Sequence, residues 1–166
     1  MIVVGIDPGT SCGVAAVSDD EVAWTTVVLP SWRHHAGGLG DGHDQCCDVL
    51  AEAITDVVHL VRHPGIQPLR SAIEDSQHAA SVRAAAVQAE HLTMAALVLS
   101  TSFDAHPIPV NPATWQHGLV GGLGRDEYVR YAVELTGGEL NPRHHDAAAA
   151  ICIAEWAWHH VVRRSE

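Results

Sequence analysis

The opening of the chain is the feature that most limits its fold. Residues 2–6 (IVVGI) form an apolar run that predicts a buried strand, but the run ends on Asp7, ahead of a Pro8-Gly9 turn and a second apolar run. A charge at the end of a buried strand is costly unless it has a partner. The sequence therefore predicts an N-terminal strand whose last carboxylate faces a binding partner.

The rest of the chain predicts an α/β protein. Further strands are expected at residues 13–17, 22–29, 69–75 and 106–110, and helices at about 43–63, 76–100, 125–137 and 143–164. The Gly-rich residues 30–42 are expected to form a mobile loop, and residues 111–124 a turn followed by a Gly-broken loop. Three adjacent strands followed by alternating helices and strands predict a single domain, residues 1–166, built on a mixed β-sheet flanked by α-helices.

Composition limits the partners that the protein can have. All nine basic residues are arginines, against 20 acidic residues and 13 histidines, for a net charge of −11. This balance argues against tight nonspecific binding to nucleic acid, but it leaves room for a local basic face or a metal-bridged contact. The four cysteines show no CxxC spacing, which favours reduced thiols in a cytoplasmic protein. No apolar run reaches the roughly 18 residues that a membrane span needs.

Three acidic residues form a candidate metal site. Asp7 ends the first strand, Glu74 lies near the end of a later strand, and Asp146 falls in the first turn of the last predicted helix. Ligands of open α/β sheets collect at the carboxyl ends of the strands. Crowded carboxylates suit Mg²⁺ or Mn²⁺, and two such ions about 3.5–4 Å apart can hydrolyse a phosphodiester. Alternation along the strand places Asp75 on the face opposite Glu74.

Each of the three acids also has a simpler interpretation. Asp7 precedes Pro-Gly and could cap a turn, and Glu74 could point to solvent. Asp146 could be an acidic residue that the helix dipole favours near a helix N-terminus.

Four segments, taken in order, resemble the RuvC-type Holliday-junction resolvases of the RNase H-like superfamily. They are "GIDPGTSCGVAAV", "AIEDSQHAASVRAAAVQAEHLTMAALVLS", "NPATWQHGLVGGLGRDEYVRYAV" and "HHDAAAAICIAEWA", and together they span nearly the whole chain. The "AEWA" tail and the tryptophan after "NPAT" look more like phage-type members of the family.

The resemblance implies a structure-selective DNA endonuclease. Asp7, Glu74 and Asp146 would be its catalytic metal ligands for Mg²⁺ or Mn²⁺. The family acts as a homodimer on four-way junctions and makes two symmetric nicks, and a two-fold dimer matches a two-fold junction. The alanine-rich helix 76–100 is the candidate for the dimer contact, although ordinary core packing would explain its composition equally well.

The sequence departs from the family pattern in three places. The family commonly carries D-A-A-D, whereas "DAAA" here leaves Ala149 at the second acidic position, so either Asp146 alone completes the site or His144 or His145 assists as ligand or proton carrier. Where the family tends to have lysines facing the scissile phosphate, this chain has Gln116 and His117, with Arg125 further on. Where the family often has a stacking aromatic after the glutamate, this chain has Gln77 and His78.

The sequence leaves room for further DNA contacts and for two other functions. Trp32, Arg33 and the two following histidines lie beside the predicted loop, where they could touch a DNA arm. An RNA-processing nuclease of the YqgF type shares the fold and a similar first strand, and is one alternative. A catalytically silent module that binds a junction or a partner is the other, favoured by the missing fourth acid and the negative net charge.

Overall fold

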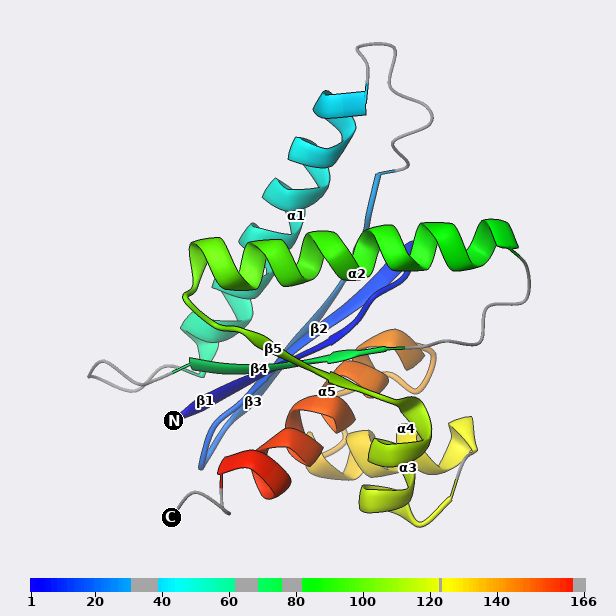
Figure 1. Cartoon of the computed structure of the whole chain (residues 1–166). Coiled ribbons are helices and arrows are strands. Elements are labelled where there is room, and N and C mark those ends of the chain that lie inside the picture. The colour runs from blue at the N-terminus through cyan, green and yellow to red at the C-terminus, as the bar shows by residue number, and fades with distance from the viewer. Residues whose placement is uncertain (31–38, 62–68, 76–81, 123, 163–166) are drawn as a thin grey trace.

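Five strands form one mixed sheet, with helices on both of its faces (Figure 1). The structure is a computed structural model, and it describes residues 1–30, 39–61, 69–75, 82–122 and 124–162. The strands are β1 (Ile2–Asp7), β2 (Ser11–Val17), β3 (Val22–Val28), β4 (Leu69–Glu74) and β5 (Pro107–Val110). The helices are α1 (Leu39–Leu60), α2 (Val82–Ser102), α3 (Pro112–Val120), α4 (Arg125–Leu135) and α5 (His145–Ala157), which continues into a π-helical turn, η2 (Trp158–Val162).

The sheet has the order β3-β2-β1-β4-β5 and confirms the predicted mixed α/β architecture. β1, β2 and β3 pair antiparallel, as expected for three adjacent strands joined by short turns. β4 pairs parallel to β1, and β5 parallel to β4. β1 therefore lies in the middle of the sheet, where its apolar run is buried.

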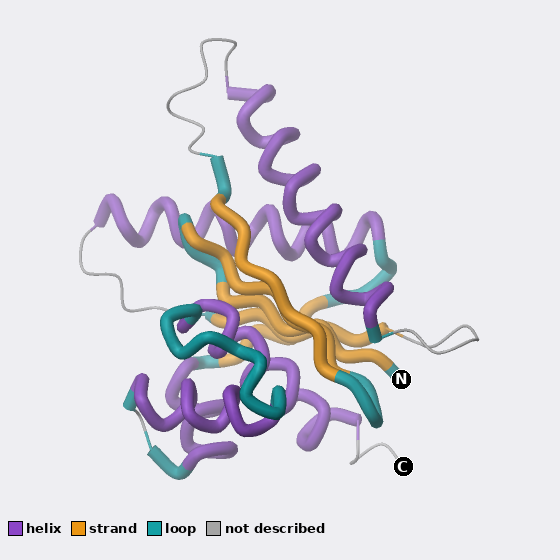
Figure 2. Tube along the Cα trace, turned by 180° about the vertical axis from the view of Figure 1, so that it is seen from behind, coloured by secondary structure: helices purple, strands orange, loops and turns teal. Residues whose placement is uncertain are grey.

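Alternation along β1 divides the core into two halves. Ile2, Val4 and Ile6 pack with α1 and α2 in one hydrophobic cluster, whereas Val3 packs with α4 and α5 in the other. Figure 2 shows from behind how the helices cover both sides of the strands. Because residues 3, 5 and 7 share a face, Asp7 points toward the α5 side of the sheet.

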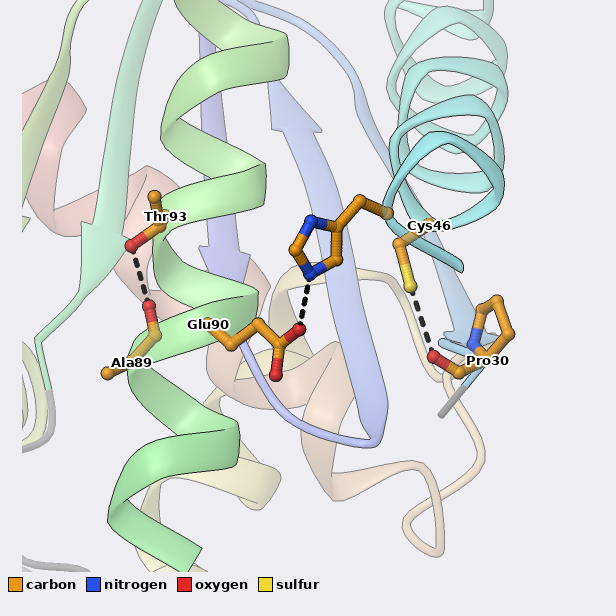
Figure 3. Close-up of polar contacts among 6 residues, drawn as sticks. Pro30, Cys46, Ala89, Glu90 and Thr93 are labelled. Atoms are coloured by element: carbon orange, nitrogen blue, oxygen red, sulfur yellow. Dashed lines mark hydrogen bonds and ion pairs between the residues drawn. The ribbon is translucent and has the colours of Figure 1, made fainter. Parts of the chain in front are cut away.

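Polar contacts fasten α1 to α2 and to the end of β3. Nε2 of His43 lies 2.8 Å from Oε1 of Glu90. Cys46 Sγ donates to the carbonyl oxygen of Pro30 at 3.1 Å, and Figure 3 shows Cys46 and Glu90 on their two helices. The four cysteines are free thiols, in agreement with the expectation from their spacing.

The prediction of a turn and an irregular loop at residues 111–124 was wrong, because residues 112–120 form the helix α3. Asn111 caps the helix, its side chain accepting from the Ala113 N–H at 2.9 Å, and Pro112 stands in the first turn, where a missing N–H costs nothing. The helix ends at Gly121, whose φ of 65° is a left-handed C-cap. The glycines thus end a helix instead of preventing one.

Several helix boundaries also differ from expectation, among them the ends of α2 at Ser102 and α4 at Leu135, against the expected 100 and 137. α1 begins at Leu39, inside the segment expected to be loop, since extending a formed helix is easy and each glycine costs only about 1 kcal/mol. The last α-helix covers His145–Ala157, shorter than the 143–164 expected, because its final turn is π-helical. Within the described ranges, no helix has the length and apolarity needed to cross a membrane.

Candidate metal centre

Asp7 and Glu74 end two neighbouring parallel strands on the same face of the sheet. The register pairs Ile6 with Ile73, so the residues that follow them stand side by side at the carboxyl ends of β1 and β4. Ile73 packs in the α1–α2 cluster and Ala72 in the α5 cluster, so alternation turns Glu74 toward α5, as it does Asp7. The parallel pairing of β1 with β4, which the sequence left open, thus brings both carboxylates to one edge of the sheet.

Asp146 reaches the same place because β2 lets α5 approach closely. Gly13 pairs with Asp7 across β1 and β2. A Cβ at Gly13 would lie only 2.0 Å from the carbonyl oxygen of Asp146, so only glycine permits this packing. Gly5 has the same role further along α5, against Ala150 and Ala154. A glycine inside a buried strand is the signal of this contact in the sequence, although it fits a bulge equally well.

Burial changes the protonation of the Asp7 and Glu74 carboxyls. Burial, followed by the charges of Glu74 and Asp146, holds the pKa of Asp7 well above its ordinary range. Burial also raises the pKa of Glu74, and a hydrogen bond from Trp115 partly offsets that rise. A cation would relieve this repulsion, and three carboxylates offer the hard oxygen ligands that Mg²⁺ and Mn²⁺ prefer.

Asp146 is engaged by its neighbours. Ser11 Oγ donates to Asp146 Oδ2 at 2.5 Å, and Nε2 of His145 lies 3.3 Å from Asp146 Oδ1. In the described part of the chain, no group of three Asp, Glu, His or Cys side chains is placed so that it could hold one metal ion. The donor set therefore fits a divalent cation in its chemistry, and Asp146 would have to exchange these partners for it.

Trp115 holds Glu74 in place. The indole Nε1–H donates to Glu74 Oε2 at 2.9 Å from a side chain that is fully buried on α3. Tyr128 packs edge-on against this indole, with ring centroids 5.4 Å apart. The sequence pattern singled out this tryptophan only for the family resemblance and did not predict its contact, because its segment was expected to be irregular.

Arg125 is a candidate DNA-binding residue that Tyr128 links to the carboxylates. Its side chain is exposed at the start of α4 and bonds to Tyr128. Burial, and then the charge of Asp7, raise the pKa of the Tyr128 hydroxyl to about 12. One tyrosine thus lies between the guanidinium and the acidic group.

The other predicted site residues lie elsewhere or outside the described ranges. His117 is exposed on α3, and His145 contacts Asp146 as described. Arg33, Gln77 and His78 lie outside the described residues. Ala149 is only 3% exposed and belongs to the α5 hydrophobic cluster, so an aspartate at this position would enter the core.

The sheet order, the helices on both faces and the acids at the ends of the central strands define the RNase H-like fold. Two solved structures of RuvC from Thermus thermophilus share it. One, a complex of RuvC with a Holliday junction substrate, has a TM-score of 0.68 and 17% identity, and the match covers 96% of this chain and 95% of RuvC. The other has a TM-score of 0.66 and 18% identity, and the match covers 99% and 97% of the two chains. No protein-family model and no curated protein sequence matches this chain.

Proposed function

We propose that the protein is a metal-dependent, structure-selective DNA endonuclease that resolves four-way junctions by paired nicks. The observation that carries the proposal is the proximity of the buried Asp7 carboxyl to Glu74 and Asp146, acids from two other elements, at one end of an RNase H-like sheet. The similarity to RuvC over nearly the full length of both chains supports the choice of branched DNA as substrate.

Each residue near the site has a role in this proposal. Asp7, Glu74 and Asp146 would hold Mg²⁺ or Mn²⁺, which when bound supplies an activated water and stabilises the leaving oxygen of a phosphodiester. Trp115 fixes one oxygen of Glu74 and leaves the other available. Arg125 offers a guanidinium to a phosphate near the carboxylates, a pairing for which arginine geometry is well suited.

Paired nicking requires two copies of the site, and we propose a homodimer through α2. An exposed strip of this helix carries Ala85, Ala89 and Leu97, the last 54% exposed. These residues recur every four or eight positions and therefore share one face of the helix. Small side chains there let two helices approach closely, and a two-fold dimer would present its two sites to a two-fold junction.

A cleavage assay tests this function. An end-labelled four-way junction and a linear duplex of the same sequence are incubated with the protein in Mg²⁺, Mn²⁺ or EDTA. We expect symmetric nicks in the junction alone, abolished by EDTA and reduced at least about 100-fold by Asp7→Asn, as is typical when a ligand of a catalytic metal site is lost. A cruciform plasmid should be linearised, because a dimer cuts both strands within one binding event.

The matched control is Asp75→Asn, which removes the same charge from the opposite face of the strand and should cut like the wild type. Junction binding without cutting in either metal would show a silent binding module instead. Cutting of structured RNA in place of the junction would favour the RNA-processing alternative.

A further inference from the structure

Several arginines of this acidic chain lie on the α4–α5 side of the sheet, which also carries the carboxylates. The structure describes the side chains of four arginines: Arg70, Arg125, Arg130 and Arg143. All four are exposed, and three of them lie on α4 or in the segment just before α5. α4 packs on α5, and Cys152 Sγ donates to the carbonyl oxygen of Tyr128 between the two helices at 3.5 Å. Arg125, Arg130 and Arg143 therefore lie on the side of the sheet that carries the site, where α4 also has Asp126, Glu127 and Glu134.

This surface is hollowed. A cavity of about 390 Å³ lies between α4 and Pro142, the residue before Arg143. Its walls are Arg125, Asp126, Val129, Arg130, Val133 and Pro142. The charged wall residues are two arginines and Asp126, and the others are apolar. The hollow therefore offers two separate guanidiniums beside an apolar surface.

These guanidiniums are not used by ion pairs among the described residues. Every ion pair within the described ranges joins a histidine to a carboxylate. Arg125 bonds to the Tyr128 side chain, a neutral partner. A chain with 20 acidic residues has many possible partners for its arginines, so unpaired guanidiniums beside a hollow favour an anionic ligand from outside.

The spacing of the arginines fits an extended polyanion better than a single small anion. Arg125 and Arg130 are separated by about 7.5 Å along the axis of α4. Successive nucleotides of a DNA strand advance about 3.4 Å along a duplex, so the two arginines would meet phosphates of different nucleotides. Arg125 lies beside Tyr128, which in turn lies near Asp7. Arg130 lies more than one helical turn further along α4.

We propose that Arg125 and Arg130, in the wall of this hollow, and Arg143, next to its wall residue Pro142, bind the phosphates of a DNA strand that lies along α4 next to the carboxylate site. The proposal rests on the nuclease function proposed above, and it adds Arg130 and Arg143, which the sequence did not single out. It also explains how an acidic protein binds DNA, since contact is confined to a few unpaired guanidiniums.

Binding measured without cleavage tests these phosphate contacts. Affinity for a fluorescent four-way junction is measured in EDTA, from 50 to 200 mM NaCl, for the wild type, Arg130→Gln and Arg143→Gln. Each variant should lose about tenfold in affinity, as for a charged hydrogen bond, and the slope of log affinity against log salt should become shallower by about one. The control Arg70→Gln removes the same charge at the opposite end of β4 and should leave affinity and slope unchanged.

Three results would overturn the phosphate contacts: no change in Arg130→Gln and Arg143→Gln, an equal loss in Arg70→Gln, or no junction binding by the wild type. A thermal melt of each variant checks that its fold is intact. Cutting in Mn²⁺ at saturating protein is scored separately. Lost affinity in a protein that never cuts keeps the phosphate contacts and rejects the nuclease, whereas cutting with unchanged affinity rejects the phosphate contacts alone.

Discussion

At the scale of single residues, the site is arranged at a cost in stability. Asp7 is buried beside two other acids, and burial and repulsion both raise the pKa of its carboxyl. In the folded protein the neutral form of Asp7 is therefore favoured more than in the unfolded chain. At neutral pH, where the unfolded carboxyl is ionised, this difference opposes folding.

Replacing Asp7 with Asn should stabilise the metal-free protein at pH 7. Because folding raises the pKa of Asp7, the protonated carboxyl stabilises the folded protein fully at a pH below the pKa in the unfolded chain, near 3.8. This stabilisation is lost as the pH rises through the higher pKa of the folded protein. The gain of Asp7→Asn should be about 1 kcal/mol or more, a rise in Tm of about 2–4 °C for a chain of this size, and it should disappear toward pH 4. Thermal melts in EDTA across this pH range measure it. A lower Tm for the variant at pH 7 would show that the carboxylate has a stabilising partner in the protein itself.

How far the sequence predicts the site depends on the residue. Asp7 and Glu74 could be predicted because each stands at the end of a buried strand, where a charge needs an explanation. Trp115 could not, because its role depends on α3, and the Asn-Pro start of that helix was outweighed by the glycines after it. Arg130 carries no local signal, since only the folded arrangement of α4 and Pro142 places it in the wall of the cavity.

At the scale of secondary-structure elements, the site depends on how closely α5 lies on the sheet. Gly5 and Gly13 face the α5 backbone, where a Cβ would come within 2.2 Å and 2.0 Å of its carbonyl oxygens. The mixed α/β sheet could be predicted from the order of the apolar runs. The depth of this packing could not, because glycines at these positions fit a turn or a bulge equally well.

Substituting Gly13 with alanine should displace α5 and destabilise the protein. The added methyl group would overlap backbone, which cannot move aside as a side chain can, so we expect a loss of about 3 kcal/mol or more in the free energy of unfolding. Urea denaturation measures this loss. Gly122→Ala is the matched control, because its nearest non-local contact would be an ordinary 3.7 Å, and it should change stability by less than about 1 kcal/mol. Equal stability of the two variants would mean that α5 does not lie as close to β2 as described.

At the scale of the whole molecule, the two faces of the sheet are specialised. The face covered by α1 and α2 has a hydrophobic cluster without the candidate acids, and it carries the exposed strip proposed for the dimer. The face covered by α3, α4 and α5 carries the three acids, Trp115 and the arginine-lined hollow. This division lets one surface meet a second copy while the other meets DNA.

The central claim is that the three acids form one metal centre, and calorimetric titration with Mn²⁺ tests it most directly. The wild type should bind Mn²⁺ with an affinity that Asp7→Asn and Glu74→Gln each weaken at least about tenfold. Asp75→Asn, which removes the same charge from the opposite face, should bind as the wild type does. Absence of Mn²⁺ binding by the wild type, or unchanged binding by Asp7→Asn, would contradict the account.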